Sequence, residues 1–235
     1  MALIPARGGS KRLPRKNLLT FSGQPLIYHS IALARSIAQI GRCVVSTEDR
    51  EIADVARQCG ADVIERPVEL ADDRASTASV ATHALATLAS AGAMPEILVL
   101  LQPNCPLRPR SLVERALIAL EESDADSVIS VSEDHRKVGT LSRDFFKPEY
   151  APGTRSQDMA ARYFENGVVY VTWAKTVMRT GSVFGERIRA IVTDPLYALG
   201  DIDTALDFAV AEYLFQTYRS HFEWPAAIPV PAEHQ

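Results

Sequence analysis

"EILVLLQP", residues 96–103, indicates the fold class of this chain. Residues 97–101 are apolar without interruption, whereas a strand with one solvated face would alternate apolar and polar side chains. Continuous apolar runs of this length are typical of central strands in a parallel sheet that helices cover on both faces. Gln102 and Pro103 follow directly, so a polar side chain is expected where this buried strand ends.

Other β-like runs lie on both sides of this stretch and alternate with helical periodicity. We expect strands at 2–5, 43–47, 62–65, 126–132 and 166–172. We expect helices at 25–37, 51–60, 76–92, 110–123 and 203–222. The alternation predicts an α/β fold, a mostly parallel sheet flanked by helices. Residues from about 133 to 165 have Pro, Gly and many charges but little periodicity, so we expect a single domain, 1–235, with an inserted arm there.

The composition argues against several classes of protein. The chain of 235 residues has a net charge of −4, which does not favour general binding of nucleic acid. It has no run of eighteen apolar residues, so no membrane span is expected. Its three cysteines are scattered without a C-x-x-C spacing, which favours reduced thiols and a cytoplasmic location.

One strongly positive segment stands out in this mildly acidic chain. "IPARGGSKRLPRKN", residues 4–17, holds five cations and no acid directly after the first expected strand. The backbone N–H groups of Gly8, Gly9 and Ser10 could surround an anion, with Arg7 and Lys16 adding full positive charge. This suits a polyphosphate, although the pattern is neither a Walker A loop nor G-x-G-x-x-G. The alternative is a solvated basic turn.

The segment closely resembles the opening signature of the acylneuraminate cytidylyltransferases, also called CMP-sialate synthetases. Five further blocks resemble this family, in the family's order and over nearly the whole chain. They are "VVSTED" (44–49), "ERPVELADDRASTASV" (65–80), "LLQPNCPLR" (100–108), "RSQDMAARYFENGVVYV" (155–171) and "GDIDTALDFAVAE" (200–212). Relatives that activate 3-deoxy-octulosonate share the IPAR start but are a weaker match.

The resemblance implies a fold, a reaction and partners. The fold would be the Rossmann-like nucleotide-diphospho-sugar transferase fold, with the arm serving a homodimer and reaching the partner's site. The enzyme would join CMP from CTP to a nonulosonic, sialic-type acid, release pyrophosphate and require Mg2+. The alternatives are another sugar acid or nucleotide, such as a CMP-3-deoxy-octulosonate product, or a nucleotide-binding regulator without activity.

The resemblance also assigns a nucleotide site. Arg7 and Lys16 match positions that stabilise the leaving pyrophosphate, and Asn17 matches a nucleotide contact, beside the Gly8, Gly9 and Ser10 backbone. Arg66 and Thr77 match positions that contact the cytidine part. Read from the sequence alone, Arg66 could instead form a surface salt bridge with Glu65 or Glu69.

A sugar site follows from the same resemblance. Gln102 matches a position that contacts the sugar or the nucleotide, the arm residues Arg155 and Gln157 match sugar-contacting positions, and Asn166 is a further candidate. A guanidinium such as that of Arg155 suits a sugar carboxylate through two parallel hydrogen bonds, which makes Arg155 a catalytic candidate with Arg7 and Lys16. For Asn166 the alternative is that Asn-Gly forms only a turn.

Asp201 and Asp203 are the candidate metal ligands. In an extended segment these two side chains point to the same side, and Mg2+ prefers one or two carboxylates together with water and phosphate oxygens. Asp203 could instead be the N-cap of the last helix.

The chain departs from the family at three places. The family often reads QPTSPLR, STD and RRQ, where this chain has Asn104-Cys105, Glu48 after Thr47, and Arg155-Ser156-Gln157. Cys105 lacks the hydroxyl of the family's serine, and Arg155-Ser156 has one arginine where the family has two. Both differences affect the expected contacts to the sugar. We therefore expect an acceptor that need not be N-acetylneuraminate, with legionaminate-type acids as the obvious alternatives.

Overall fold

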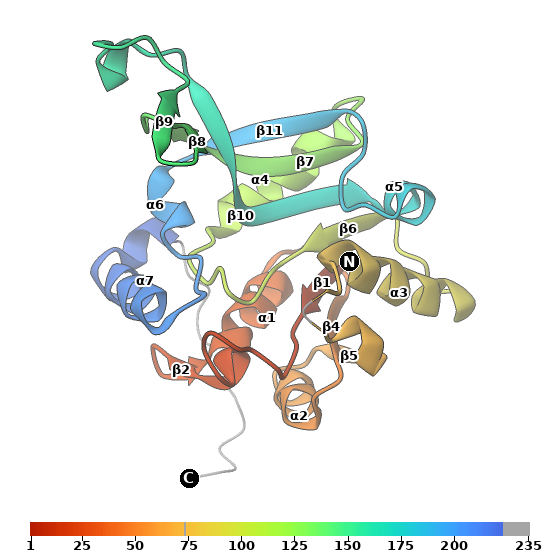
Figure 1. Cartoon of the computed structure of the whole chain (residues 1–235). Coiled ribbons are helices and arrows are strands. Elements are labelled where there is room, and N and C mark those ends of the chain that lie inside the picture. Colours follow the sequence, from red (N-terminus) through yellow and green to blue (C-terminus); the bar gives the residue numbers. More distant parts are fainter. Residues whose placement is uncertain (73, 223–235) are drawn as a thin grey trace.

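A computed structural model describes residues 1–72 and 74–222 of the chain (Figure 1). The strands of the main sheet are β1 (Ala2–Pro5), β4 (Cys43–Thr47), β5 (Asp62–Glu65), β6 (Ile97–Leu100), β7 (Ser127–Asp134), β10 (Arg162–Trp173) and β11 (Ile188–Thr193). The α-helices are α1 (Leu26–Ser36), α2 (Arg50–Gln58), α3 (Thr77–Ser90), α4 (Arg110–Glu121), α5 (Ala174–Thr180), α6 (Pro195–Ala198) and α7 (Ala205–Thr217). Short 3-10 turns lie at η1 (Lys16–Leu18), η2 (Val68–Leu70), η3 (Ser156–Asp158) and η4 (Arg219–Phe222).

The seven strands form one sheet in the order β11-β7-β10-β6-β1-β4-β5. β1 is paired in parallel with β4 and β6, and β11 is parallel to β7. β10 lies between β6 and β7 and runs antiparallel to both. The mostly parallel α/β sheet predicted from the sequence is confirmed.

Helices cover both faces of the sheet, and each face has its own apolar core. On one face α1, α2 and α4 pack against the strands, with Ile31, Ile52 and Val113 among the buried residues. On the other face α3 and α5 pack through residues such as Leu85 and Val177. A third cluster joins α7 to the β2–β3 hairpin (Thr20–Phe21, Gln24–Pro25) through Phe21 and Phe215. The central run of residues 97–101 is therefore apolar because it is covered from two sides.

Side-chain caps fix where the helices begin near the sheet's polar edge. Asp49 accepts a hydrogen bond from the backbone of Ile52 and starts α2, and Ser76 does the same for α3. Thr204 and Asp207 form a capping box at the start of α7. The alternative prediction that Asp203 caps the last helix is thus wrong, because Thr204 holds that position.

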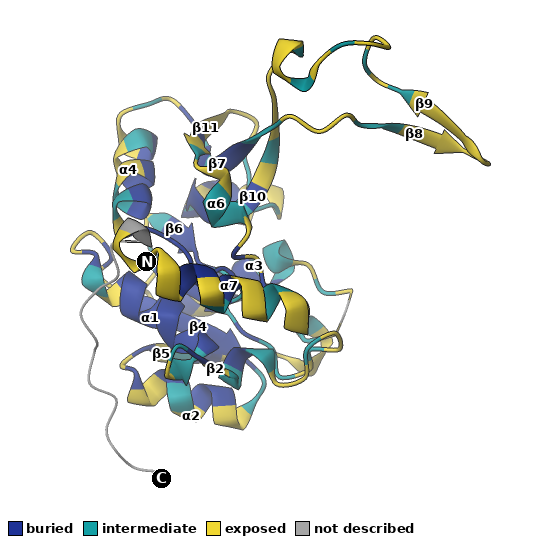
Figure 2. Cartoon of the chain, turned by 90° about the vertical axis from the view of Figure 1, so that its left-hand side faces the viewer, coloured by how far each residue is buried: buried dark blue, intermediate teal, exposed yellow. Residues whose placement is uncertain are grey.

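The segment between β7 and β10 projects from the body (Figure 2). It contains the hairpin β8 (Gly139–Ser142) and β9 (Phe145–Pro148), followed by η3. Its apolar side chains are open to solvent, with Phe145 78% exposed and Leu141 72% exposed. This is the region in which the sequence predicts an inserted arm, and we call residues 135–161 the arm.

The sequence patterns did not predict α5 and β11, which lie between β10 and the last helix. β11 forms the edge of the sheet and Ile191 is the one buried residue of its six, so it lacks the continuous apolar run of the inner strands. The predicted final helix, 203–222, is shorter, because α7 ends at Thr217 and a 3-10 turn follows. Residues 223–235 of the predicted single domain lie outside the described part. No helix among the described residues is both long enough and apolar enough to span a membrane.

Candidate active site

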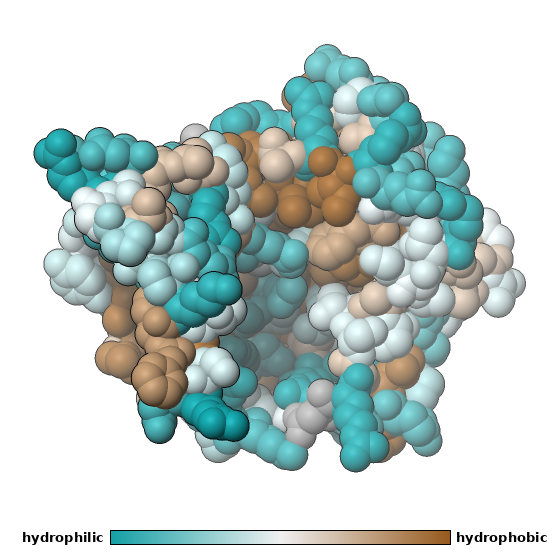
Figure 3. All heavy atoms as spheres, turned by 45° about the horizontal axis from the view of Figure 1, so that its top comes forward, coloured by the Kyte–Doolittle hydropathy of each residue, from teal (hydrophilic) through white to brown (hydrophobic). Residues whose placement is uncertain are grey.

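A polar cleft opens where β1, β5 and β6 end at the same edge of the sheet. One cavity there, of about 280 Å³, is lined by residues that arrive from separate loops. Six of the predicted nucleotide- and sugar-contacting residues are among them: Arg7, Lys16, Asn17, Arg66, Thr77 and Gln102. A hollow with a hydrophilic floor is visible at the centre of the face drawn in Figure 3. The loops converge because ligand crevices in such sheets form at the carboxyl ends of strands.

Two further cavities adjoin the first and share lining residues with it. One, of about 510 Å³, lies along the basic loop between Ser10 and Asp203 and shares Arg7, Lys16 and Asn17. The other, of about 230 Å³, shares Gln102 and is also lined by Asn166 and Asp201. The three cavities are neighbours and extend from the basic loop to β10. Such a series has room for a long, polar substrate pair.

Internal hydrogen bonds hold the basic loop in shape. Asn17 is buried, and its Nδ2 donates to the carbonyl of Arg7 at 2.9 Å, which ties the two ends of the loop together. The backbone N–H of Gly8 donates to Glu48 Oε1 at 2.8 Å, and that of Ser10 donates to the Gly8 carbonyl. The N–H groups of Gly8 and Ser10 therefore have partners within the protein, and their predicted role in anion binding stays a prediction.

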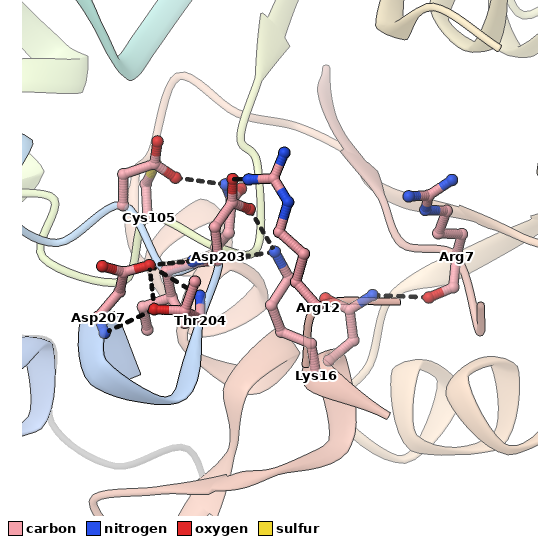
Figure 4. Close-up of polar contacts among 11 residues, drawn as sticks. Arg7, Arg12, Lys16, Cys105, Asp203, Thr204 and Asp207 are labelled. Carbon is pink, nitrogen blue, oxygen red and sulfur yellow. Dashed lines mark hydrogen bonds and ion pairs between the residues drawn. The ribbon is translucent and has the colours of Figure 1, made fainter. Parts of the chain in front are cut away.

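Cations of the loop meet Asp203 at the other side of the cleft (Figure 4). Lys16 Nζ lies 3.1 Å from Asp203 Oδ1 and donates to the carbonyl of Ile202 at 2.7 Å. Arg12 Nη1 lies 2.9 Å from Asp203 Oδ2. Arg7 lies apart from this group and donates to the Asp72 carbonyl at 3.2 Å. Cations of the basic loop and a carboxylate from the opposite side of the cleft are thus ion-paired.

Asp201 lines the 230 Å³ cavity. Its Oδ1 accepts a hydrogen bond from Asn104 Nδ2 at 2.5 Å, and the thiol of Cys105 lies 3.9 Å from the same oxygen. Loss of hydration, and next the negative charge of Asp203, raise the pKa of the Asp201 carboxyl. Two like charges are therefore held near one another, an arrangement that a bound cation would relieve. Cys105 itself is buried, and burial raises its pKa to about 12.

Arg66 forms a buried ion pair at the base of the first cavity. Its Nη2 lies 3.0 Å from Glu48 Oε2, and its Nη1 donates to the Leu70 carbonyl at 3.3 Å. The salt bridge that the sequence allowed with Glu65 or Glu69 is wrong, because Glu48 is the partner. Within the described part of the chain, the buried Nε and Nη2 of Arg66 have no hydrogen-bond acceptor, although Nη2 is ion-paired with Glu48. A ligand in this cavity could supply one.

A model of the cytidylyltransferase family matches residues 1–217. The chain belongs to the cytidylyltransferase family.

Curated relatives are similar in sequence to this cytidylyltransferase over most of its length. It is 32% identical to the CMP-N,N'-diacetyllegionaminic acid synthase of Legionella pneumophila, over 92% of this chain and 96% of that protein. It is 28% identical to the pseudaminic acid cytidylyltransferase of Campylobacter jejuni, over 92% and 96%. It is 31% identical to the N-acylneuraminate cytidylyltransferase of Streptococcus agalactiae, over 93% of this chain but 54% of that protein, so it spans about half of that relative. The resemblance predicted from the motifs is confirmed.

Solved structures agree with this fold at lower identity. A CMP:2-keto-3-deoxy-manno-octonic acid synthetase complexed with CTP matches with a TM-score of 0.69 at 18% identity, over 92% of this chain and 98% of that one. The 4-diphosphocytidyl-2C-methyl-D-erythritol synthase of Anaerococcus prevotii matches with a TM-score of 0.66 at 13% identity, over 92% and 95%. The nucleotidyltransferase fold predicted for the chain is therefore confirmed.

Asn166 is bound into the body of the cytidylyltransferase by its own hydrogen bonds. Its Nδ2 donates to Ser132 at 2.9 Å and Thr193 at 2.8 Å, and its Oδ1 accepts from Ser130 at 2.6 Å and the backbone of Val168 at 3.2 Å. These bonds use both donors and both lone pairs of the amide. The side chain therefore joins β7, β10 and β11, and sugar contact by Asn166 stays a prediction. The predicted Asn-Gly turn is instead an irregularity inside β10, with Gly167 at φ +73°.

Arg155 and Gln157 lie on the arm of the cytidylyltransferase. The side chain of Arg155 is 76% exposed, and its Nε lies 3.1 Å from Asp158. Neither Arg155 nor Gln157 lines the three cavities of the cleft. The two predicted arm residues are therefore not brought to the site within one described chain.

Two residues of the site were not predicted from the sequence. Arg108 is 1% exposed and donates to the carbonyls of Val168 and Gln102. It fastens the loop that carries Gln102 to β10. Glu48, noticed only as a departure from the family pattern, contacts both Gly8 and Arg66. An acid at the carboxyl end of a fully buried strand was the signal that could have identified it.

Proposed function

We propose that this cytidylyltransferase transfers CMP from CTP to a nonulosonic acid and releases pyrophosphate. The observation that carries the proposal is the 280 Å³ cavity that unites Arg7, Lys16, Asn17, Arg66, Thr77 and Gln102 from loops far apart in the sequence. The named relatives that act on legionaminic, pseudaminic and N-acylneuraminic acids support the class of acceptor.

The positive side of the cleft would hold the triphosphate. In this reaction the sugar hydroxyl attacks the α-phosphorus, and negative charge builds up on the leaving pyrophosphate. Arg7 and Lys16 are fixed by backbone contacts beside the cavity, so they need little rearrangement to face that charge. Preorganised cations of this kind typically contribute on the order of 100-fold or more to the rate.

The opposite side would provide the ligands for a divalent cation, which we propose is Mg2+. Within the described residues, no three His, Cys, Asp or Glu side chains gather into a metal-binding group. Asp201 and Asp203 suit this ion, because Mg2+ takes most of its other ligands from water and phosphate, and the exposed Arg12 that pairs with Asp203 Oδ2 would give way to it. Burial first, and then the charge of Asp203, raises the pKa of Asp201, and a cation at this carboxylate would offset both effects. When bound, Mg2+ would supply positive charge at the α-phosphate and lower the pKa of the attacking hydroxyl.

We propose further that the enzyme is a cytoplasmic homodimer whose arm serves the partner's site. The exposed apolar side chains of Leu141 and Phe145 support burial of the arm against a second copy. Arg155 would then bring its guanidinium to the sugar carboxylate in the partner's cleft. The described cysteines are buried free thiols, in keeping with a reducing compartment.

The test is pyrophosphate release from CTP with Mg2+ and a panel of acceptors. The panel contains N-acetylneuraminate, a legionaminate, a pseudaminate and 3-deoxy-octulosonate, and UTP replaces CTP in parallel. Turnover of CTP with one or more of the nonulosonates is expected. Exclusive use of the octulosonate, or no turnover with any acceptor, would contradict the proposal.

A further inference from the structure

Glu48 contacts both sides of the nucleotide cleft. It follows β4 and lies between the basic loop and the segment after β5. Its Oε1 accepts the backbone N–H of Gly8 at 2.8 Å, and its Oε2 lies 3.0 Å from Arg66 Nη2. One carboxylate therefore joins the loop on the phosphate side of the cavity to the guanidinium at its base.

Both partners of this ion pair are shielded from water. The side chain of Arg66 is 4% exposed and that of Glu48 is 18% exposed. Burial lowers the pKa of Arg66, and the charge of Glu48 opposes that effect. Arg66 Nη2 and Glu48 Oε2 have no other partner among the described residues, so removal of one side chain leaves the other charge uncompensated. Glu48 therefore sets the position from which Arg66 faces the cavity.

The neighbouring residue holds the same loop at a second point. Asp49 Oδ2 lies 2.6 Å from Arg15 Nη1, while Asp49 Oδ1 accepts the backbone N–H of Ile52. Gly8 packs so closely on Asp49 that an added Cβ would lie 2.4 Å from Asp49 Oδ2. The basic loop thus rests on two consecutive carboxylates, and Glu48 is the one that also reaches Arg66.

We propose that Glu48 is a positioning residue that couples recognition of the nucleotide base, through Arg66, to the placement of the phosphate-side loop, through Gly8. This inference rests on the proposed function, because it assigns the cavity to CTP. It predicts that a change at residue 48 alters the preference for cytosine although Glu48 need not touch the nucleotide.

Titration calorimetry without any sugar acid tests the coupling. The ligands are CTP, UTP and inorganic tripolyphosphate, and the variants are Glu48→Gln and Glu48→Ala. The matched control is Asp54→Asn, which removes an exposed carboxylate that pairs with Arg57 at 3.0 Å on α2. Glu48→Gln keeps an oxygen for Gly8 but loses the charge facing Arg66, whereas Glu48→Ala loses both.

We expect Glu48→Gln to weaken CTP binding by about 10-fold or more and to lower the CTP-to-UTP affinity ratio, since bonds to charged groups are the stronger ones. Tripolyphosphate should bind Glu48→Gln within about twofold of the parent protein, because the Gly8 contact remains. Glu48→Ala should weaken both CTP and tripolyphosphate. Unchanged affinities and an unchanged CTP-to-UTP ratio in both Glu48 variants would overturn the proposal.

The double variant Glu48→Gln/Arg66→Gln removes the ion pair as a unit and avoids an unpaired buried charge. If Glu48 acts through Arg66, Glu48→Gln should have little further effect on CTP binding in an Arg66→Gln background. Full additivity would refute the coupling. Normal CTP binding by the parent protein without transfer to any acid would count against the proposed function and leave the role of Glu48 intact.

Discussion

The cleft and the arm both carry predicted site residues, but these residues differ in burial and in their contacts within the chain. In the cleft, Arg66, Asn17 and Lys16 are buried or half-buried and each has a partner inside the chain. On the arm, Arg155 and the hairpin side chains of Leu141 and Phe145 are exposed. The loops of the cleft contact one another because sheet topology brings them together. The arm has no such support within one described chain, so it is the part expected to depend on a second copy.

The largest effect is expected from Asp203→Asn, which tests the cleft alone. The substitution keeps the side chain's size but removes the charge that faces Lys16 and the proposed cation. The turnover number should fall on the order of 1000-fold, because transition-state charge is then poorly balanced. CTP affinity should change far less. Steady-state kinetics and calorimetry measure the two effects, with Asp124→Asn, whose carboxylate pairs with Arg187, as the control. Full activity would remove Asp203 from the mechanism.

A smaller loss, about 10- to 100-fold in kcat/KM for the sugar acid, is expected from Arg155→Ala. The decisive measurement mixes this variant with Asp203→Asn after dissociation and reassociation. If Arg155 acts in the partner's cleft, each mixed dimer has one intact site out of two. Random reassociation of equal amounts makes about half of the dimers mixed, so activity should return to about a quarter of the parent level. No recovery in a verified mixed dimer would show that the arm serves its own chain.

The body should also be sensitive to acid through His29. This ring is buried between Phe21 and Phe215, and burial lowers its pKa from 6.5 to about 4. An unfolded chain takes up the proton at higher pH than the folded one, so stability is present above pH 6.5 and is lost as the pH falls toward 4. The loss should reach roughly 3 kcal/mol. Denaturant midpoints from pH 7 to 4 measure it. His29→Gln should flatten the curve over that range, and an unaltered slope would contradict this assignment.

The smallest effect on the body is expected from Phe145→Ser at the tip of the arm. The side chain is 78% exposed, so the thermal midpoint of the isolated chain should change by less than the equivalent of about 0.5 kcal/mol. The same variant should shift a dimer toward the monomer in light scattering. A lower thermal midpoint without any change in assembly would show that Phe145 stabilises its own chain, and would contradict the role of the arm in the dimer.

The sequence was informative where a residue's position follows from strand order. Residues 97–101 predicted a covered central strand with Gln102 at its end, and the resemblance to a known family predicted most of the other cleft residues. β11 and the antiparallel direction of β10 were not predictable from periodicity, because neither direction nor edge position changes the local pattern. The partner of Arg66 was also not predictable, since Glu65 and Glu69 are near in sequence while Glu48 is near only in space.

The insertion of β10 between β6 and β7 has a consequence for synthesis on the ribosome. β1, β4, β5 and β6 with their helices are complete by residue 100 and already pair with one another. β7 joins that half only through β10, which is made after the arm. A nascent chain halted before residue 162 therefore exposes an open edge at β6 and holds β7 without a strand to bridge the gap. Premature release at that stage would yield a species prone to pairing with other chains.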